Sequence, residues 1–167
     1  MIHLETLPAE TTTMAIATSV AVMRIPANLD YSSAVRDFAL ASLKNVGGFD
    51  STWAYRLQLV VDEVFMNAVR YGSGPESSIT ITFDYAPHRV IISIEDEGMG
   101  TTRVRPHDLE QHIIAARRTA DEQRIRGEKN FALSGRGLAQ LVSAWTDSVT
   151  FSDSPIGGIR VTLTKAL

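Results

Sequence analysis

Two polar side chains, Glu63 and Asn67, interrupt the most regular apolar stretch of this 167-residue chain. The stretch runs from Leu57 to Gly72 with the period of an amphipathic helix, in which residues four apart stack on one face. The pair would therefore present a proton acceptor and an amide oxygen to the same small volume, which suits the handling of a metal-bound phosphate. A solvated polar stripe has the same spacing, so the pair alone leaves both interpretations open.

The apolar residues of this stretch predict where the pair lies. They form one face of the helix: Leu57, Val60, Val61, Val64, Phe65 and Ala68. On a helical wheel Glu63 and Asn67 fall on the flank of that face, where a side chain borders the core and can line a cleft.

Asp96 is the second candidate, because it stands between an apolar strand pattern and the turn Gly98-Met99-Gly100. A carboxylate on a rigid element can accept a hydrogen bond from an exocyclic amine, and glycines let a flat ring approach the main chain closely. An ordinary hairpin turn explains the same residues equally well.

A third segment, Gly135-Arg136-Gly137, precedes a helical pattern. A helix start offers unpaired N–H groups and a positive dipole end to an anion, so phosphate suits this position. A loop that simply ends in a helix is the alternative. The sequence has neither a P-loop pattern nor a dinucleotide-binding glycine pattern after a first strand, so a nucleotide would bind by another route.

The elements that must position these groups follow from periodicity and from capping and turn residues. A strand is predicted at 20–25, then a helix from Asn28 or Asp30 to Gly47-Gly48, and a second helix from Asp50 or Ser51 to the turn at 72–75. The apolar positions of the first helix are Ala34, Phe38, Ala41 and Leu43.

Alternating apolar residues predict a strand hairpin at 79–83 and 90–94, and two further strands at 147–151 and 159–163. A helix with Leu138, Leu141, Val142 and Trp145 on one face precedes the last two strands. Residues 101–134 are arginine-rich, with a weak helical pattern in Leu109, Ile113, Ile114 and Ala116, and we expect them to form a lid. This order favours an α+β sandwich, with one largely antiparallel sheet under a helical layer.

Length and composition favour a single domain at 20–167 after a loose arm at 1–19. The chain has no cysteine and its four histidines lack zinc-ligand spacing, which excludes disulfides and thiolate metal sites. A net charge of −3 gives no reason to expect direct nucleic acid binding, and the mildly apolar segment 13–23 is too short to span a bilayer. We therefore expect a cytoplasmic protein without membrane contact.

The order of the three motifs resembles the GHKL ATPases: a helix with Glu-x-x-x-Asn, then Asp-x-Gly-x-Gly, then Gly-x-Gly. Within that superfamily the chain is most similar to the anti-sigma-factor serine kinases of the RsbW and SpoIIAB type, in size and in its opening segment 23–27. The likeness spans about residues 20 to 165. It implies a Bergerat-type (histidine-kinase-like ATPase) sandwich, with ATP between the helical layer and the lid.

The resemblance also implies roles for the polar residues. Glu63 would be the general base, Asn67 would bind Mg2+ beside the phosphates, and Asp96 would accept the adenine amine. Arg36 matches a family arginine associated with partner contacts.

The same resemblance assigns the glycines to the nucleotide. Gly98 and Gly100 would make room for the base, while Gly135 and Gly137 would cradle the phosphates.

The implied function is an anti-sigma factor with serine/threonine-protein kinase activity. It would transfer phosphate from ATP to a STAS-type antagonist of the anti-sigma factor and, in its other state, sequester a sigma factor and so regulate transcription. The family suggests a homodimer. The alternative is a GHKL-fold nucleotide-binding module, weakly catalytic or inactive, that acts by binding a partner. A catalytic domain detached from a sensor histidine kinase ranks last, because the chain has no phosphoacceptor-helix region.

Two departures from the family pattern favour the alternative. Tyr71 stands where the family usually has His. Near the last strand the chain reads Gly158-Ile159-Arg160-Val161 where the family tends to read Gly-Thr-Thr-Val, so Ile159 replaces a hydroxyl expected near the phosphates. The second departure bears on kinase activity more than on nucleotide binding.

Overall fold

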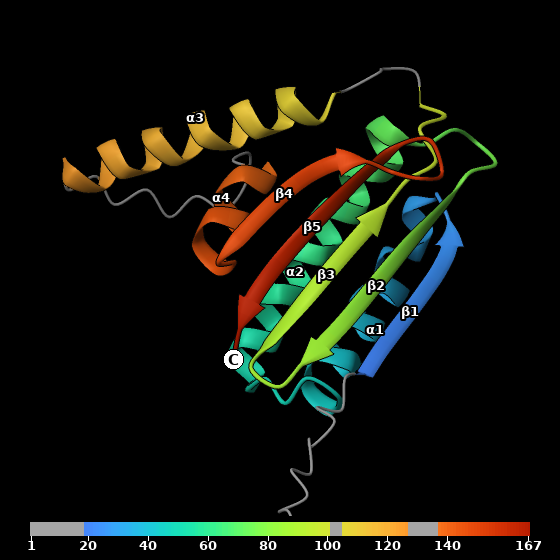
Figure 1. Cartoon of the computed structure of the whole chain (residues 1–167), viewed down its shortest axis with the longest axis horizontal. Coiled ribbons are helices and arrows are strands. Elements are labelled where there is room, and N and C mark those ends of the chain that lie inside the picture. The colour runs from blue at the N-terminus through green and yellow to red at the C-terminus, as the bar shows by residue number, and fades with distance from the viewer. Residues whose placement is uncertain (1–18, 101–104, 127–136) are drawn as a thin grey trace, which may run out of the picture.

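The computed structural model describes residues 19–100, 105–126 and 137–167 (Figure 1). The elements, in chain order, are β1 (Ser19–Pro26), η1 (Leu29–Tyr31), α1 (Ser32–Asn45), α2 (Ser51–Asn67), η2 (Ala68–Gly72), β2 (Ser78–Ala86), β3 (Arg89–Glu95), α3 (Pro106–Ile125), α4 (Gly137–Trp145), β4 (Ser148–Asp153) and β5 (Ile159–Ala166). η1 is a 3-10 turn and η2 a π-helical turn.

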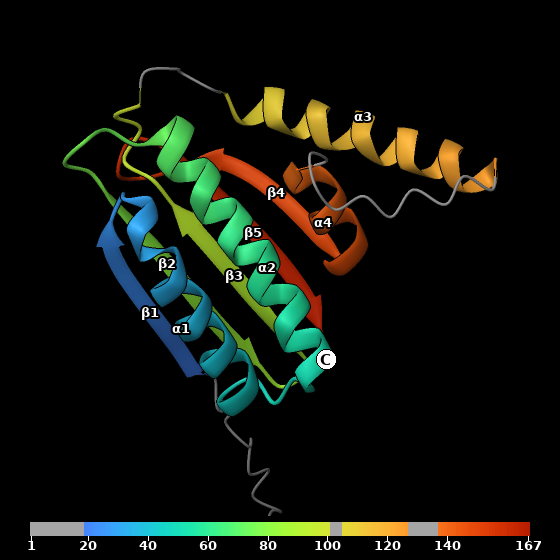
Figure 2. The ribbon, with the colours of Figure 1, turned by 180° about the vertical axis from the view of Figure 1, so that it is seen from behind.

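The five described strands form one antiparallel sheet in the order β1-β2-β3-β5-β4. β2 and β3 make the predicted hairpin, with Ile81 opposite Ile94, and β5 pairs with β3 so that Ile94 is opposite Val161. α1, α2 and α4 cover one face of this sheet (Figures 1 and 2). The predicted α+β sandwich is therefore confirmed.

The core lies between the sheet and the helices. Alternate residues of β2 and β3 point into it and are almost fully buried: Ile79, Ile81, Phe83, Val90, Ile92 and Ile94. Five of the six predicted core residues of α2 are buried against them, and the sixth, Ala68, is partly buried against the same core. Burying a large aliphatic or aromatic side chain contributes roughly 1.5–3 kcal/mol, so this contact fixes α2 on the sheet.

The first helix differs from its prediction. Asn28 caps η1, its side chain accepting a hydrogen bond from the Asp30 N–H at 3.0 Å, and α1 begins afterwards. Of the four apolar positions named from the sequence, Ala34 and Ala41 are exposed. The face turned to the core consists of Val35, Ala39, Ser42 and Leu43, with Phe38 packed beside it. Alanine fits either side of a helix, so these two alanines could not indicate the buried face.

α3 occupies the middle of the predicted lid. It packs against α4 and β4 and extends beyond the sheet (Figures 1 and 2). Of the predicted apolar positions, Ile113 is buried and Leu109 packs against the core, whereas Ile114 is 58% exposed. The rest of the predicted lid and most of the predicted arm lie outside the described residues.

Among the described helices, none combines the length and apolar character needed to cross a lipid bilayer.

Candidate functional site

Glu63 and Asn67 lie on α2, as predicted. The helix begins at Asp50, whose carboxylate accepts a hydrogen bond from the Trp53 N–H at 3.0 Å, and this satisfies one of the free N–H groups of the first turn. Both polar side chains are half-buried on the flank of the buried face. Their spacing of four residues places them one above the other at the edge of the helical layer.

The residue before Glu63 anchors α2 to α1. Asp62 is buried, and its two carboxylate oxygens accept hydrogen bonds from the Ser32 hydroxyl at 2.6 Å and from the Arg36 guanidinium at 3.0 Å. The same Arg36 nitrogen also donates to the Ser32 hydroxyl at 3.0 Å. This cluster was not predicted from the sequence, although an aspartate inside an apolar run is a signal for it. Arg36, expected to contact a partner, thus has an internal role in the helical layer.

The helix does not stop at Asn67. It continues as the π-turn η2, which carries the exposed Tyr71 and ends at Gly72. π-helical turns are rare and often occur at functional sites. Gly72 lies five residues after Asn67, less than about 8 Å along the axis at about 1.5 Å per residue.

Asp96 meets the end of this helix. A methyl group on Gly72 would touch the Asp96 carboxylate, with 2.5 Å between the added carbon and Cγ. A methyl group on Gly158 would touch the same carboxylate from the β4–β5 turn. The side chain of Asp96, 6% exposed, therefore occupies a slot between two glycines.

The two carboxylate oxygens of Asp96 differ. Oδ1 accepts hydrogen bonds from the N–H groups of Gly98 at 2.9 Å and Ile159 at 3.3 Å. Among the described residues Oδ2 has no donor, and it lies on the side of the slot that faces Gly72. Burial raises the pKa of Asp96, against the smaller lowering effect of the Gly98 and Ile159 hydrogen bonds. A buried acceptor with one oxygen fixed and one free is suited to the exocyclic amine predicted from the sequence.

Gly98 and Gly100 allow close approach between chain segments. Gly98 has a φ of +68°, and a methyl group there would lie 2.8 Å from Cα of Gly158. A methyl group on Gly100 would lie 3.1 Å from the carbonyl carbon of Gly72. These two glycines pack the 96–100 loop against η2 and the β4–β5 turn, so the space their missing side chains leave is filled by the protein's own backbone. Any room for a base lies on another side of this loop.

Gly137 is the first residue of α4, which packs against α2. Gly135 lies outside the described residues, and its predicted contact with phosphate stays a prediction. For the metal, the described residues contain no cluster of three His, Cys, Asp or Glu side chains. Mg2+ keeps several waters and takes few protein ligands, so binding through the oxygen of Asn67 would not need such a cluster, and this role of Asn67 stays a prediction.

Ile159 lies at a different place from the one expected. Its N–H donates to Asp96 and its carbonyl accepts from the Asp96 N–H at 3.2 Å, so the two residues are neighbours across the sheet. The departure from the family pattern thus lies at the Asp96 end of the site, which is the end predicted for the base rather than for the phosphates.

These contacts join the end of the α2–η2 helix, the 96–100 loop and the β4–β5 turn into one site. The sequence model of the histidine kinase-like ATPase domain matches residues 25–165, which is most of the chain. The chain belongs to this family. Membership indicates an ATP-binding domain of the GHKL type, the kind used by kinases and ATPases. No curated protein shows significant similarity to the chain.

Proposed function

We propose that this GHKL domain is a serine/threonine-protein kinase of the RsbW and SpoIIAB type. It would phosphorylate a serine of a small STAS-type antagonist from Mg-ATP and, in its other state, hold a sigma factor. The observation that carries the proposal is the position of the Asp96 carboxylate at the end of the helix that bears Glu63 and Asn67. The resemblance in residues 23–27 supports the subtype.

The chain's own residues would divide the reaction between the two ends of the site. Oδ2 of Asp96 would accept the adenine amine and so fix the nucleotide in register with α2. The amide oxygen of Asn67 would hold Mg2+, which supplies charge neutralisation to the phosphates when bound. Glu63, one turn earlier, would accept the proton of the attacking serine hydroxyl. Phosphoryl transfer depends mainly on positioning and charge, so this small set of groups is sufficient.

The test is a transfer assay with radiolabelled ATP, Mg2+ and STAS domains from the same genome. We expect phosphoserine on an antagonist with the wild-type chain and with Asp37→Asn, which removes an exposed carboxylate of α1. Glu63→Gln should abolish transfer while ATP binding, measured by calorimetry, is retained; Asn67→Ala should weaken the Mg2+-dependent part of binding. Transfer by Glu63→Gln at the wild-type rate would refute the role of Glu63.

A second candidate function is a nucleotide-binding module that acts by sequestering a partner. Tyr71 supports it, because this exposed residue stands in η2 where the family usually has His. The same experiments separate the two functions. ATP binding without transfer to any antagonist tested, while an active family member transfers in parallel, would select the module.

A further inference from the structure

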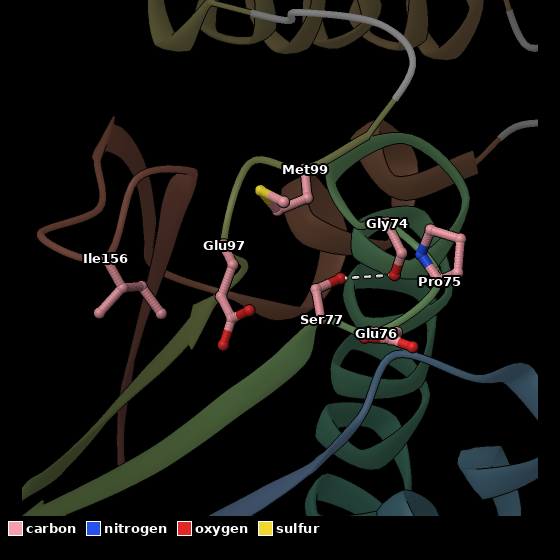
Figure 3. A pocket seen from close by; sticks show the side chains of 7 residues that line it. All are labelled: Gly74, Pro75, Glu76, Ser77, Glu97, Met99 and Ile156. Atoms are coloured by element: carbon pink, nitrogen blue, oxygen red, sulfur yellow. Dashed lines mark hydrogen bonds between the residues drawn. The ribbon is translucent and has the colours of Figure 1, made fainter.

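A hollow lies at one end of the sheet, with a volume of about 610 Å³ (Figure 3). Three connections of the chain line it: the segment 74–77 before β2, Glu97 and Met99 after β3, and Ile156 in the β4–β5 turn. It borders the 96–100 loop, yet neither Glu63, Asn67 nor Asp96 lines it.

The hollow and the Asp96 slot lie on opposite sides of the same loop. The buried residues of β3, ending with Ile94, face the helices, and the pairing of Asp96 with Ile159 extends this alternation so that Asp96 faces the same way. Glu97 then points the other way. Its carboxylate pairs at 3.1 Å with Arg24, an exposed residue on the open face of β1.

The lining combines apolar surface with negative charge. Met99 is 70% exposed and Ile156 is 48% exposed, a large uncovered area for two apolar side chains that share one hollow. Within the described residues, the exposed carboxylate of Glu76 has no partner. The side chain of Glu97 is 25% exposed, and its single ion pair is with Arg24, whose side chain is 67% exposed. Ser77 offers little to a ligand, because it is buried and its hydroxyl donates to the Gly74 carbonyl at 2.7 Å.

We propose that this hollow binds a protein segment in which an arginine or lysine lies next to an aliphatic side chain. The methylene stem of the arginine or lysine would pack on Met99 and Ile156, and its charged end would reach the carboxylates of Glu76 and Glu97. The volume of about 610 Å³ lies in the range of pockets that hold a drug-sized ligand, which is enough for a short peptide segment. The negative lining disfavours phosphate and nucleic acid, and the described residues offer no cluster of three metal-binding side chains.

Arg24 already pairs with Glu97, so it would compete with the basic side chain of the ligand for the Glu97 carboxylate. An exposed ion pair contributes little stability, so an incoming guanidinium can displace Arg24 from Glu97 or share the carboxylate with it. Substitutions of Glu97 and Arg24 should therefore have opposite effects on the affinity for the ligand. Loss of Glu97 removes an attractive charge, whereas loss of Arg24 removes a competing one. The inference goes beyond the proposed kinase function and does not depend on it.

The probe is an acetylated, amidated Arg-Leu-Arg peptide, titrated into the full 15N-labelled chain without nucleotide and followed by amide NMR. We expect saturable shifts confined to residues around the hollow, including Glu76, Glu97, Met99 and Ile156. Glu97→Gln or Glu76→Gln should each weaken binding about threefold and Arg24→Gln should tighten it about twofold, the size expected of exposed ion pairs. Asp84→Asn, an exposed carboxylate elsewhere on the sheet, is the matched control.

Three results would overturn the inference: equal shifts with a Glu-Leu-Glu peptide, shifts centred on α2, or displacement of the peptide by ATP. The first result would show that the hollow does not recognise positive charge. The other two would show that the peptide binds in the nucleotide site. Each variant's amide spectrum reports its folding in the same experiment. Because the titration contains no ATP and no phosphoacceptor, its failure is distinct from failure of the kinase assay.

Discussion

Asp96 uses a single carboxylate oxygen for both of its backbone hydrogen bonds, which makes Asp96→Asn a sharp test of the site. Oδ1 already accepts from the Gly98 and Ile159 N–H groups. The amide oxygen of an asparagine must take this position, because its NH2 group cannot accept these bonds. The NH2 group would then occupy the place of Oδ2 and present a donor to the adenine amine, itself a donor.

The expected effect on binding is therefore large. Loss of a hydrogen bond to a charged acceptor costs about 1.5–3 kcal/mol, which corresponds to a dissociation constant at least about tenfold weaker. The two opposed donors add to this loss. Calorimetry with ATP and Mg2+ measures it, with Asp84→Asn as the control that should bind like the wild type.

The expected effect on stability is small and depends on pH. The substitution weakens two hydrogen bonds but removes the cost of burying a charge, so the free energy of unfolding at pH 7 should change by less than about 1 kcal/mol. Burial raises the pKa of Asp96, so the folded chain holds this proton more tightly than the unfolded chain does. As the pH falls from above that raised pKa towards the ordinary carboxyl range, the wild type should gain stability relative to Asp96→Asn.

Urea unfolding of both chains at pH 7 and about pH 4 checks the pH effect. Two results would refute the reasoning. Wild-type affinity for ATP in Asp96→Asn would show that Oδ2 does not face the base. A variant that is much less stable at pH 7 would show that Asp96 serves the fold, and its loss of binding would then carry no information about the site.

Three further predictions concern the Asp96 slot, the contact between α1 and α2, and the end of β5 far from the site. Gly72→Ala should push the Asp96 carboxylate out of its slot, lowering stability by about 1–3 kcal/mol and weakening ATP binding, as urea unfolding and calorimetry will measure. Asp62→Asn removes the ion pair to α1 and should cost about 1–2 kcal/mol, allowing for the partly exposed arginine; unchanged urea unfolding would contradict this. Backbone hydrogen bonding from Ala166, then a lysine side chain, lowers the pKa of Asp147, so its contribution to stability should be lost as the pH falls through that lowered pKa, and the acid limb of the stability curve should flatten in Asp147→Asn.

The fold was largely predictable because its signals are local. Alternation in β2 and β3 and the apolar stripe of α2 each lie within one element, and all three elements form where expected. Asp50 caps α2 as predicted. The apolar positions of α1 did not all mark its buried face. Ala34 and Ala41 are exposed, because alanine has too little apolar surface to decide which side of the helix faces the core.

The site was predictable in its parts but not in its contacts. The slot around Asp96 is formed by Gly72 and Gly158, which are far apart in the sequence and meet through sheet pairing and the η2 turn. Nothing local distinguishes these glycines from ordinary turn glycines. The link from Asp62 to α1 was hidden for the same reason, since its two partners lie in another helix.

The position of Ile159 changes what the departure from the family pattern means. From the sequence, the missing hydroxyl was assigned to the phosphates and so to catalysis. In the structure, the main chain of Ile159 pairs with Asp96, so the substitution lies at the end of the site that is predicted for the base. A change there would act on the affinity and orientation of the nucleotide, whereas proton transfer and metal binding would depend on Glu63 and Asn67, nine and five residues before Gly72. Ile159 therefore argues less strongly against a kinase than the sequence suggested, and the choice between kinase and binding module rests on the α2 pair.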